Sequence, residues 1–288
     1  MKRTMTNLSG KKCLITGAAS GIGRALAQAA ARRGAVLFLT DVNAAGLDTA
    51  VAEVRAAGGA VAWSAALDVA DYAAVCRAAD EIHAAHGSLD VLMNVAGIAV
   101  WGTVERLRHA QWRRAIEVNL MGPIHVMECF VPAMIAAGRG GHLVNVSSAA
   151  GLFGLPWHAP YSASKFGLRG VCEVLRFDLE RHGIGVSLVC PGGVDTGLVN
   201  TVEIEGVDPN DQRLLKFKRR FQKRAVTPER AAAAILRGIE RERYLVFTSF
   251  DVRLGYWAQR WFPPAYEYVM RRLNDRLHTL ARPLVAPR

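Results

Sequence analysis

The chain has 288 residues with 51% hydrophobic side chains, enough to bury the core of one large α/β domain. Its formal net charge of +11 lies mainly in residues 201–288, which hold 18 Lys and Arg against 10 Asp and Glu. This excess fits nucleic acid, an anionic membrane surface or solubility alone, so it defines no function. Five cysteines without a C-x-x-C pair argue against a disulfide framework or a zinc site. With neither an apolar leader nor a run of about 18 uncharged apolar residues, we expect a cytoplasmic protein.

Short apolar runs alternate with Ala-rich helical segments along residues 1–250, for which we predict a single domain. The apolar runs are continuous, as expected for strands covered by helices on both faces. Roughly seven such units predict an α/β fold with a doubly wound, Rossmann-type parallel sheet. Strands are predicted at CLIT (13–16), AVLFLT (35–40), AVAWSAAL (60–67), LDVLMNVAG (89–97), GHLVNVSS (141–148), IGVSLVCPGG (184–193) and YLVFT (244–248), and helices at 21–33, 43–57, 71–86, 108–118, 119–137, 160–182 and 227–241.

Polar and glycine-rich stretches follow the predicted strands. Right-handed crossovers place the C-terminal ends of parallel strands on one rim, where ligands bind in open α/β sheets. We therefore expect the functional residues on that rim. The stretches are TGAASGIG, DVN, LDV, NVAG, VSS and PGGVDTG.

The first of these stretches joins an apolar strand to a helix through Gly17, Gly21 and Gly23. Glycines permit a tight turn and let backbone N–H groups approach a pyrophosphate, which the positive end of the helix dipole also favours. The spacing G-x-x-x-G-x-G differs from the commoner G-x-G-x-x-G, and an ordinary strand-to-helix turn remains an alternative.

Asp41 ends the next strand, where its carboxylate is placed to accept hydrogen bonds from the adenosine ribose. A 2′-phosphate there would meet like charge, and neither Ser20 nor Val42 supplies a cation, so NAD(H) is favoured over NADP(H). Two alternatives stay open. Asp41 is also placed to cap the following helix, and Arg24 could turn toward the ribose and restore NADP(H) binding.

The stretch APYSASKFGLRG, residues 159–170, places Tyr161 and Lys165 four positions apart. Residues at i and i+4 are neighbours on one helix face. A free tyrosine, with a pKa of about 10, is a poor base near neutrality. A cation about 4 Å away stabilises the phenolate by up to roughly 4 kcal/mol, which predicts a pKa near about 7 for Tyr161.

Together with these motifs, others occur in an order that resembles the short-chain dehydrogenase/reductase family, in the subgroup marked by T-G-x-x-x-G-I-G and Y-x-x-x-K. The resemblance covers roughly residues 9–250. Val95 departs from it, because the family usually repeats Asn there. The matches are Thr16 to Gly23, Asp68, Asn94 to Gly97, Asn119, Ser148, Tyr161 with Lys165, and Pro191-Gly192 through Thr196.

The resemblance implies a catalytic set of Asn119, Ser148, Tyr161 and Lys165. Tyr161 would exchange a proton with the substrate oxygen while a hydride moves to or from a nicotinamide. Ser148 would bind the substrate oxygen, Lys165 would hold the nicotinamide ribose, and Asn119 would support a water that links Lys165 to solvent. Ser147 is expected to be structural.

The resemblance also implies a set of cofactor contacts. Asp68 would accept from the adenine amine, and Val194 and Thr196 would contact the nicotinamide carboxamide. No metal site is expected. The implied cofactor-binding residues are Gly17, Ser20, Gly21, Ile22, Gly23, Asp41, Asp68, Val69, Asn94, Ala96, Gly97, Tyr161, Lys165, Pro191, Gly192, Val194 and Thr196.

The substrate pocket is expected to be apolar, which favours a lipophilic alcohol or ketone such as a steroid, retinoid, fatty or aromatic compound. His158 is expected at the pocket rim or the surface, and residues 197–225 resemble the family's variable substrate loop. The apolar residues could instead pack the loop or a dimer face. They are Leu152, Phe153, Leu155, Pro156 and Trp157.

Residues 251–288 predict a basic, helical extension, divided into two helices at Pro263-Pro264. One side carries arginines at 271, 272 and 276. This amphipathic segment is expected either to lie on an anionic membrane or to pack on its own domain or subunit. Its apolar stripe is Tyr266, Val269, Met270, Leu273, Leu277 and Leu280.

The sequence thus favours an NAD(H)-dependent alcohol dehydrogenase or carbonyl reductase that acts on a small molecule. The resemblance implies a homodimer or homotetramer that pairs helices 108–137 and 160–182. A rival is a cofactor-sensing or scaffold protein with the same fold, although such a protein has no chemical need for all four catalytic residues. A nucleic-acid binder would rest on the basic tail alone, and none is expected.

Overall fold

The computed structural model describes residues 7–196 and 225–281, together with positions 203, 204, 212, 215, 216 and 219. The predicted substrate loop, residues 197–225, lies almost wholly outside the described residues. Residues 1–6 and the end of the predicted extension, residues 282–288, also lie outside them.

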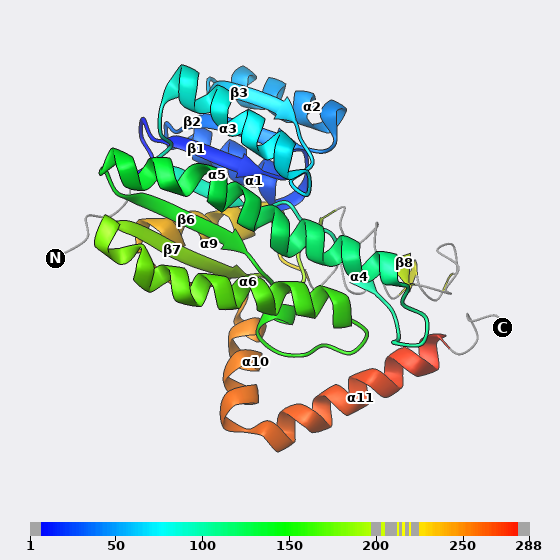
Figure 1. Cartoon of the computed structure of the whole chain (residues 1–288). Helices are drawn as coiled ribbons and strands as arrows, with labels where there is room; N and C mark the ends of the chain where they lie inside the picture. Colours follow the sequence, from blue (N-terminus) through cyan, green and yellow to red (C-terminus); the bar gives the residue numbers. More distant parts are fainter. Residues whose placement is uncertain are drawn as a thin grey trace.

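Within this part of the chain, seven parallel strands form one sheet (Figure 1). The chain enters in the middle of the sheet, builds outward on one side and then returns to build the other side. The strand order therefore reverses beside the first strand, at a switch point where α/β proteins bind ligands. The spatial order is β3 (Ala60–Ala66), β2 (Val36–Asp41), β1 (Lys12–Thr16), β4 (Val91–Asn94), β6 (Gly141–Val146), β7 (Ile184–Cys190) and β9 (Leu245–Phe247), with a separate pair of β5 (Val100–Trp101) and β8 (Glu203–Ile204).

Helices cover both faces of this sheet, as Figure 1 shows. The helices α1 (Gly21–Ala31), α2 (Ala44–Ala56) and α9 (Pro228–Glu240) pack on one face. The helices α3 (Tyr72–His86), α5 (Gly122–Ala137) and α6 (Ala159–Asp178) pack on the other. The predicted fold class, a doubly wound parallel sheet with a helical C-terminal extension, is confirmed.

Alternate residues of each strand feed two separate cores. In β1, Cys13 and Ile15 belong to the core under α1 and α9, whereas Leu14 belongs to the core under α5 and α6. In β2, Leu37 and Phe38 divide in the same way. Because successive strand side chains point to opposite faces, a strand covered on both sides must be apolar throughout. This explains the continuous apolar runs of the sequence.

One long helical path differs from the prediction. The sequence predicted a boundary between residues 118 and 119, but α4 (His109–Ile116) continues through a π-helical turn, η1 (Glu117–Met121), into α5. The path His109–Ala137 also meets the length and composition criteria for a membrane span, contrary to the sequence expectation. It packs against α3 and α6 as part of the α/β body, and a core helix meets the same criteria.

Two further helices follow β9. They are α10 (Phe250–Trp261) and α11 (Pro263–Ala281), and the break falls at the proline pair, as predicted. On α11 the predicted stripe is partly buried at Tyr266, Met270, Leu273 and Leu277, whereas Val269 is 54% exposed. The Leu280 side chain lies outside the described residues. The division into a domain of residues 1–250 and an extension of residues 251–288 stays a prediction.

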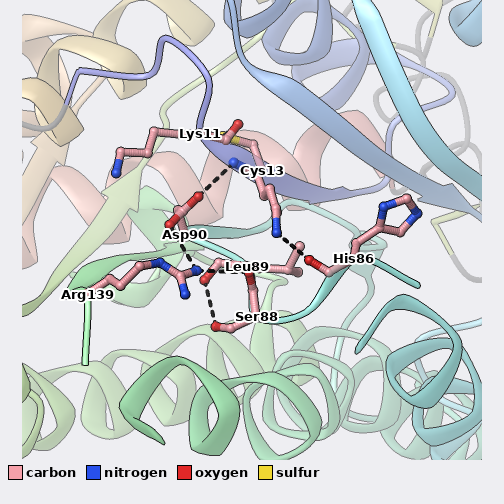
Figure 2. A network of polar contacts seen from close by, with 8 residues as sticks. Lys11, Cys13, His86, Ser88, Leu89, Asp90 and Arg139 are labelled. Atoms are coloured by element: carbon pink, nitrogen blue, oxygen red, sulfur yellow. Dashed lines mark hydrogen bonds and ion pairs between the residues drawn. The ribbon is translucent and has the colours of Figure 1, made fainter. Parts of the chain in front are cut away.

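At the amino ends of the strands, Asp90 joins three neighbouring segments (Figure 2). One carboxylate oxygen accepts from the backbone N–H of Lys12 at 3.0 Å, and the other lies 3.4 Å from the Arg139 guanidinium. The Asp90 backbone N–H donates to the Lys12 carbonyl, and its carbonyl accepts from the His142 N–H, both at 3.0 Å. Asp90 therefore links the starts of β1, β4 and β6.

At the same edge, the cationic side chains of Lys12 and Arg139 also donate to backbone carbonyls. The Lys12 ammonium donates to the carbonyl of His86, at the end of α3. The Arg139 guanidinium also donates to the carbonyl of Ser88, at 3.1 Å (Figure 2). These polar groups hydrogen-bond with one another, so this edge holds the strands and the end of α3 together.

Candidate active site

Helix α6 carries the tyrosine and the lysine at the opposite, carboxyl edge of the sheet. Pro160 lies in its first turn, where a missing backbone N–H breaks no helical bond. The Lys165 Nζ atom lies 5.8 Å from the centre of the Tyr161 ring and donates to the Val146 carbonyl at 2.9 Å. Lys165 is only 3% exposed, so its ammonium is fixed at the end of β6.

Ser148 follows β6 directly and begins the short 3₁₀ helix η2 (Ala149–Gly151). Its hydroxyl accepts from the Ala150 N–H at 3.1 Å and hydrogen-bonds with Tyr161. The neighbouring Ser147 is buried, and its hydroxyl donates to the Lys165 backbone carbonyl at 3.1 Å. The two serines thus have the different roles expected, since Ser147 holds α6 against β6 and Ser148 faces the tyrosine.

The ionisation of the pair differs from the sequence prediction. Burial raises the pKa of Tyr161, and the hydrogen bond from Ser148 opposes this only in part. Burial also lowers the pKa of Lys165 to about 8. The predicted fall of the Tyr161 pKa toward neutrality is therefore wrong for this arrangement. The cause is that the Lys165 ammonium is directed to Val146, while the loss of water disfavours the phenolate.

Asn119 lies inside the π-helical turn and is completely buried. Its amide oxygen accepts from the Ile98 N–H at 2.8 Å, and its amide nitrogen donates to the Ile98 carbonyl at 3.0 Å and to the Ser164 hydroxyl at 3.2 Å. A Cβ placed on Gly97 would lie 3.0 Å from Asn119 Oδ1 and 3.5 Å from Lys165 Nζ. Asn119 therefore fixes the chain after β4 against α6, next to Lys165.

The glycine loop, called the glycine cradle below, packs so closely on neighbouring backbone that a side chain would collide with it. Gly17 has φ +70°, and a Cβ there would lie 2.8 Å from the Ala96 backbone. A Cβ on Gly23 would lie 1.9 Å from the Gly17 carbonyl oxygen. The Thr16 hydroxyl accepts from the N–H groups of Val95 and Ala96, at 3.0 and 3.1 Å, which joins the loop to the end of β4. These contacts fit a loop that carries a pyrophosphate on backbone N–H groups at a helix N-terminus.

Asp41 lies at the end of β2, with its carboxylate held by backbone N–H groups. One oxygen accepts from Ala19 at 3.0 Å and the other from Asn43 at 2.9 Å. The cap of α2 is Asn43, whose side chain accepts from Gly46, so Asp41 is not that cap. Asp41 therefore links the glycine loop to the turn after β2.

Arg24, the residue that could restore NADP(H) binding, is held elsewhere. Its guanidinium pairs with the Glu53 carboxylate through two nitrogens, one of them at 2.8 Å. Gln28 donates to the same carboxylate at 3.0 Å. This pairing connects α1 to α2 and occupies the arginine away from Asp41.

The segment after β7 closes over the glycine loop. A Cβ on Gly21 would lie 2.9 Å from the Thr196 methyl group, and Val194 forms an isolated β-bridge with Val226. The Pro191 carbonyl accepts from the Ala149 N–H at 2.7 Å, beside Ser148. The structure therefore places Thr196 beside the glycine loop and Pro191 beside the serine.

Asn94 was predicted to contact the cofactor, but it is 2% exposed inside the sheet. Its amide nitrogen donates to Asn145 Oδ1 at 2.9 Å, which cross-links β4 and β6. The side chain therefore lies among the strands, and a contact of Asn94 with the cofactor stays a prediction.

Four other predicted cofactor-binding residues also have defined positions. Asp68 is exposed at the rim after β3, and its carboxylate accepts from the Ala70 N–H at 2.9 Å. Val69 is buried, and its carbonyl is 2.9 Å from His125 Nδ1. Ser20 is exposed and Ile22 partly buried at the start of α1.

Sequence reasoning missed an aromatic wall beside Tyr161. His158 is 9% exposed, its ring lies 4.3 Å from the Trp101 ring and 6.3 Å from the Tyr161 ring, and Nδ1 is 2.7 Å from the Pro156 carbonyl. Burial lowers the pKa of His158, so the ring is neutral near pH 7. Trp101 is 57 positions away in sequence, and no local pattern signalled this contact.

The loop before Tyr161 has a strained backbone and is held by contacts from α11. Trp157 has φ +67°, which is unfavourable for a bulky side chain and is most often kept at functional sites. Its ring lies 5.3 Å from His278, and the Tyr266 hydroxyl donates to the Gly154 carbonyl at 2.7 Å. Both partners come from α11, so this helix fixes the loop that leads to Tyr161.

The glycine cradle and the Ser148, Tyr161 and Lys165 cluster on one rim of a Rossmann-type sheet define a nucleotide-dependent oxidoreductase. The family model described as short chain dehydrogenase matches residues 11–205. The chain belongs to the short-chain dehydrogenase family and is an oxidoreductase of that family.

Known relatives agree. The chain is 36% identical over 253 residues to the oxidoreductase SadH of Mycobacterium tuberculosis, covering 86% of this chain and 90% of that protein. It is 40% identical over 191 residues to D-threitol dehydrogenase of Mycolicibacterium smegmatis, covering 66% and 73%. A short-chain dehydrogenase from Burkholderia phymatum, solved with NAD, has a TM-score of 0.79, 30% identity and coverage of 89% and 95%. The structural neighbours include proteins solved with NAD and with NADP.

Proposed function

We propose that this protein is an alcohol dehydrogenase or carbonyl reductase that uses NAD(H). The observation that carries the proposal is the cluster of Ser148, Tyr161 and Lys165 on the same rim as the glycine cradle. When bound, the nicotinamide supplies the hydride donor or acceptor. The chain supplies a proton donor, a hydroxyl for the substrate oxygen and a buried cation.

Each residue has one task in this mechanism. Ser148 binds the substrate oxygen and holds the Tyr161 hydroxyl toward it. Tyr161, whose raised pKa keeps the phenol protonated near neutrality, donates its proton to a carbonyl oxygen that is being reduced. Lys165 binds the nicotinamide ribose and stabilises the phenolate that remains. Asn119 positions the backbone beside Lys165.

The preference for NAD(H) is supported by the charges near the ribose position. Asp41 is held at the end of β2 by two backbone N–H groups, and a 2′-phosphate bound beside it would meet its negative charge. Arg24 is paired with Glu53 and so does not neutralise it. Both facts favour the ribose 2′-hydroxyl over a 2′-phosphate.

A lipophilic or aromatic carbonyl remains the proposed substrate class. Support comes from the wall of Trp101, His158 and Tyr161, which offers flat apolar rings near the phenol. The set of pocket residues is narrower than predicted. Leu152 and Phe153 are 1% and 8% exposed and belong to the core, so they pack the loop.

Assembly and location are part of the same proposal. Members of the family act on small molecules and form oligomers, and we infer a homodimer or homotetramer here. Exposed apolar residues on α6, namely Phe166, Val174 and Phe177, are 39%, 59% and 61% exposed and support a partner on that helix. The five free cysteines fit a reducing, cytoplasmic setting.

The proposal is tested by a spectrophotometric screen of NAD+ and NADP+ with small polyols, aliphatic alcohols and aromatic alcohols, and of the reduced cofactors with the matching carbonyls. Tyr161→Phe is the matched control because it removes only the hydroxyl. We expect activity with an aromatic or long-chain substrate and a loss of about 10²–10⁴-fold in the variant. Undiminished activity in Tyr161→Phe overturns the mechanism, and turnover of polyols alone overturns the substrate class.

The same screen distinguishes the proposed enzyme from the rival function. A cofactor sensor or scaffold with this fold would bind NAD(H) but turn over none of the substrates. Isothermal titration with NADH, run on the same samples, separates a protein that binds without turnover from one that does not bind.

A further inference from the structure

The inner face of α10 is fixed on the catalytic body. Val252 is 2% exposed within the core, and the Tyr256 ring lies 6.0 Å from the Phe247 ring. A Cβ on Gly255 would lie 3.0 Å from the Phe153 ring. These contacts set the rotation of α10, so its opposite face cannot turn inward.

That opposite face is apolar. Phe250, Leu254, Trp257 and Trp261 follow one another at i, i+4, i+7 and i+11, which places them along one side of the helix. They are 75%, 57%, 45% and 66% exposed. We call these four residues the outer stripe. Contiguous exposed apolar side chains of this size mark an interaction surface.

Arginines flank the outer stripe. Arg253 and Arg260 are exposed and seven positions apart, so they lie on the same flank of α10. Their long side chains can place a charge at headgroup level while the stripe inserts more deeply. Tryptophan and phenylalanine beside arginine are the composition of helices that lie in a membrane interface.

The second helix of the extension offers a smaller apolar surface, with Tyr268 and Val269 exposed at 60% and 54%. Tyr266 donates to the Gly154 carbonyl, and His278 lies against Trp157, so the inner side of α11 is used by its own body. The sequence placed the amphipathic candidate on α11. The exposed apolar face is instead on α10, which projects from the body below α6 in Figure 1.

We propose that the outer stripe of α10 docks this protein onto an anionic lipid surface. The charge of the chain decides between a membrane and a second copy. Each chain carries +11, and an antiparallel two-fold pairing of stripes would place the like-charged Arg253 and Arg260 of both copies on the same side. Anionic headgroups supply the opposite charge. Docking does not depend on the proposed reaction.

Vesicle co-sedimentation of the full-length protein tests this proposal. The probes are phosphatidylcholine vesicles with and without phosphatidylglycerol. The stripe variant is Trp257→Ser with Trp261→Ser, and the charge variant is Arg253→Gln with Arg260→Gln. The matched control is Tyr72→Ser with Val104→Ser, which removes two exposed apolar side chains that lie outside both α10 and α6. Circular dichroism melting confirms that each variant is folded.

We expect the wild type to sediment with vesicles that contain phosphatidylglycerol. The stripe variant should lose at least about tenfold in its partition coefficient, because it no longer buries two indole rings. The control should keep its binding, and the charge variant should lose binding to the anionic vesicles more than to the neutral ones.

Four results would overturn the assignment. The wild type could remain in the supernatant with anionic vesicles, or the stripe variant could sediment as the wild type does. Equal losses in the stripe variant and the control would also reject α10 as the docking surface. A stripe variant that becomes a smaller particle by light scattering would assign the outer stripe to a second copy of the chain.

Discussion

Asp90 and Lys165 are both charged residues buried at strand ends, but they lie at opposite edges of the same sheet. At the amino edge, both carboxylate oxygens of Asp90 have partners, in Lys12 and Arg139 (Figure 2). At the carboxyl edge, the Lys165 ammonium has three donor hydrogens and one acceptor among the described residues, the Val146 carbonyl. At the amino edge the polar groups hydrogen-bond with one another, whereas at the carboxyl edge Lys165 retains donor hydrogens for a ligand.

This difference has a cost for the carboxyl edge. A buried ammonium with few partners loses hydration that nothing replaces, and the pKa of Lys165 falls to about 8 for this reason. The glycine cradle and the positive φ of Trp157 lie at the same edge. We conclude that the amino edge stabilises the sheet and that the carboxyl edge gives up stability for binding and catalysis.

The largest effect is expected at Lys165. Lys165→Met should lower kcat/KM by about 10²–10⁴-fold, because the phenolate of Tyr161 and the ribose lose their cation. Between pH 8 and the unfolded value of 10.5, the unfolded chain binds a proton that the folded chain lacks. The free energy of unfolding therefore rises with pH across that window. Burial of the Lys165 ammonium destabilises the folded state most below about pH 8.

Chemical denaturation of the wild type and Lys165→Met, at about pH 7 and about pH 10, measures this cost. The free energy of unfolding of Lys165→Met minus that of the wild type should be larger at the lower pH, because the wild type then contains the buried charge. Lys165→Arg is the control, since it retains a charge in the same place. If the difference in the free energy of unfolding did not change with pH, the lowered pKa of the buried Lys165 would be contradicted.

The sequence was sufficient to predict that Ser148, Tyr161 and Lys165 lie together at the carboxyl edge. Tyr161 and Lys165 share a helix face because of their spacing, and Ser148 follows an apolar strand, so local patterns set both positions. The fold class followed from the same alternation. These features depend on residues that are neighbours in the chain.

Other features depend on burial and on distant partners, which no local pattern records. The direction of the Tyr161 pKa shift follows from how much protein covers the phenol. Asn119 is engaged by Ile98, 21 positions away, and His158 by Trp101. The face of α11 that packs on the body is set by Gly154, 112 positions before Tyr266. Tertiary packing decided each of these.

Asp41 sharpens the comparison because it lies at the carboxyl edge and yet both its oxygens are engaged. Asp41→Asn removes the negative charge and keeps one acceptor. The ratio of kcat/KM for NADP+ to that for NAD+ should rise about tenfold, since a 2′-phosphate no longer meets like charge. Steady-state kinetics with both cofactors measures it, and Asp68→Asn serves as the control. An unchanged ratio would mean that Asp41 acts only as a structural join.

At the amino edge the expected effect is on stability alone. Asp90→Ala leaves the Lys12 N–H and the Arg139 guanidinium without their carboxylate, and should lower the free energy of unfolding by about 1–3 kcal/mol. Values of kcat/KM should stay within about twofold, because the far edge of the sheet is intact. Urea denaturation and steady-state kinetics on one preparation test both parts. A large fall in activity of the folded variant would show that the two edges are coupled.

The smallest effect is expected for Arg139→Gln, which removes the other partner of the same ion pair. The Arg139 side chain is 50% exposed and lies 3.4 Å from Asp90, so water and salt screen the attraction. Asp90 also keeps its bond from the Lys12 N–H, and glutamine still offers a donor near Ser88. The free energy of unfolding should fall by less than about 1 kcal/mol, and by less still at high salt. If urea denaturation gave Arg139→Gln the same loss as Asp90→Ala, the guanidinium rather than the backbone N–H would be what holds Asp90, and the amino edge would depend on a surface charge.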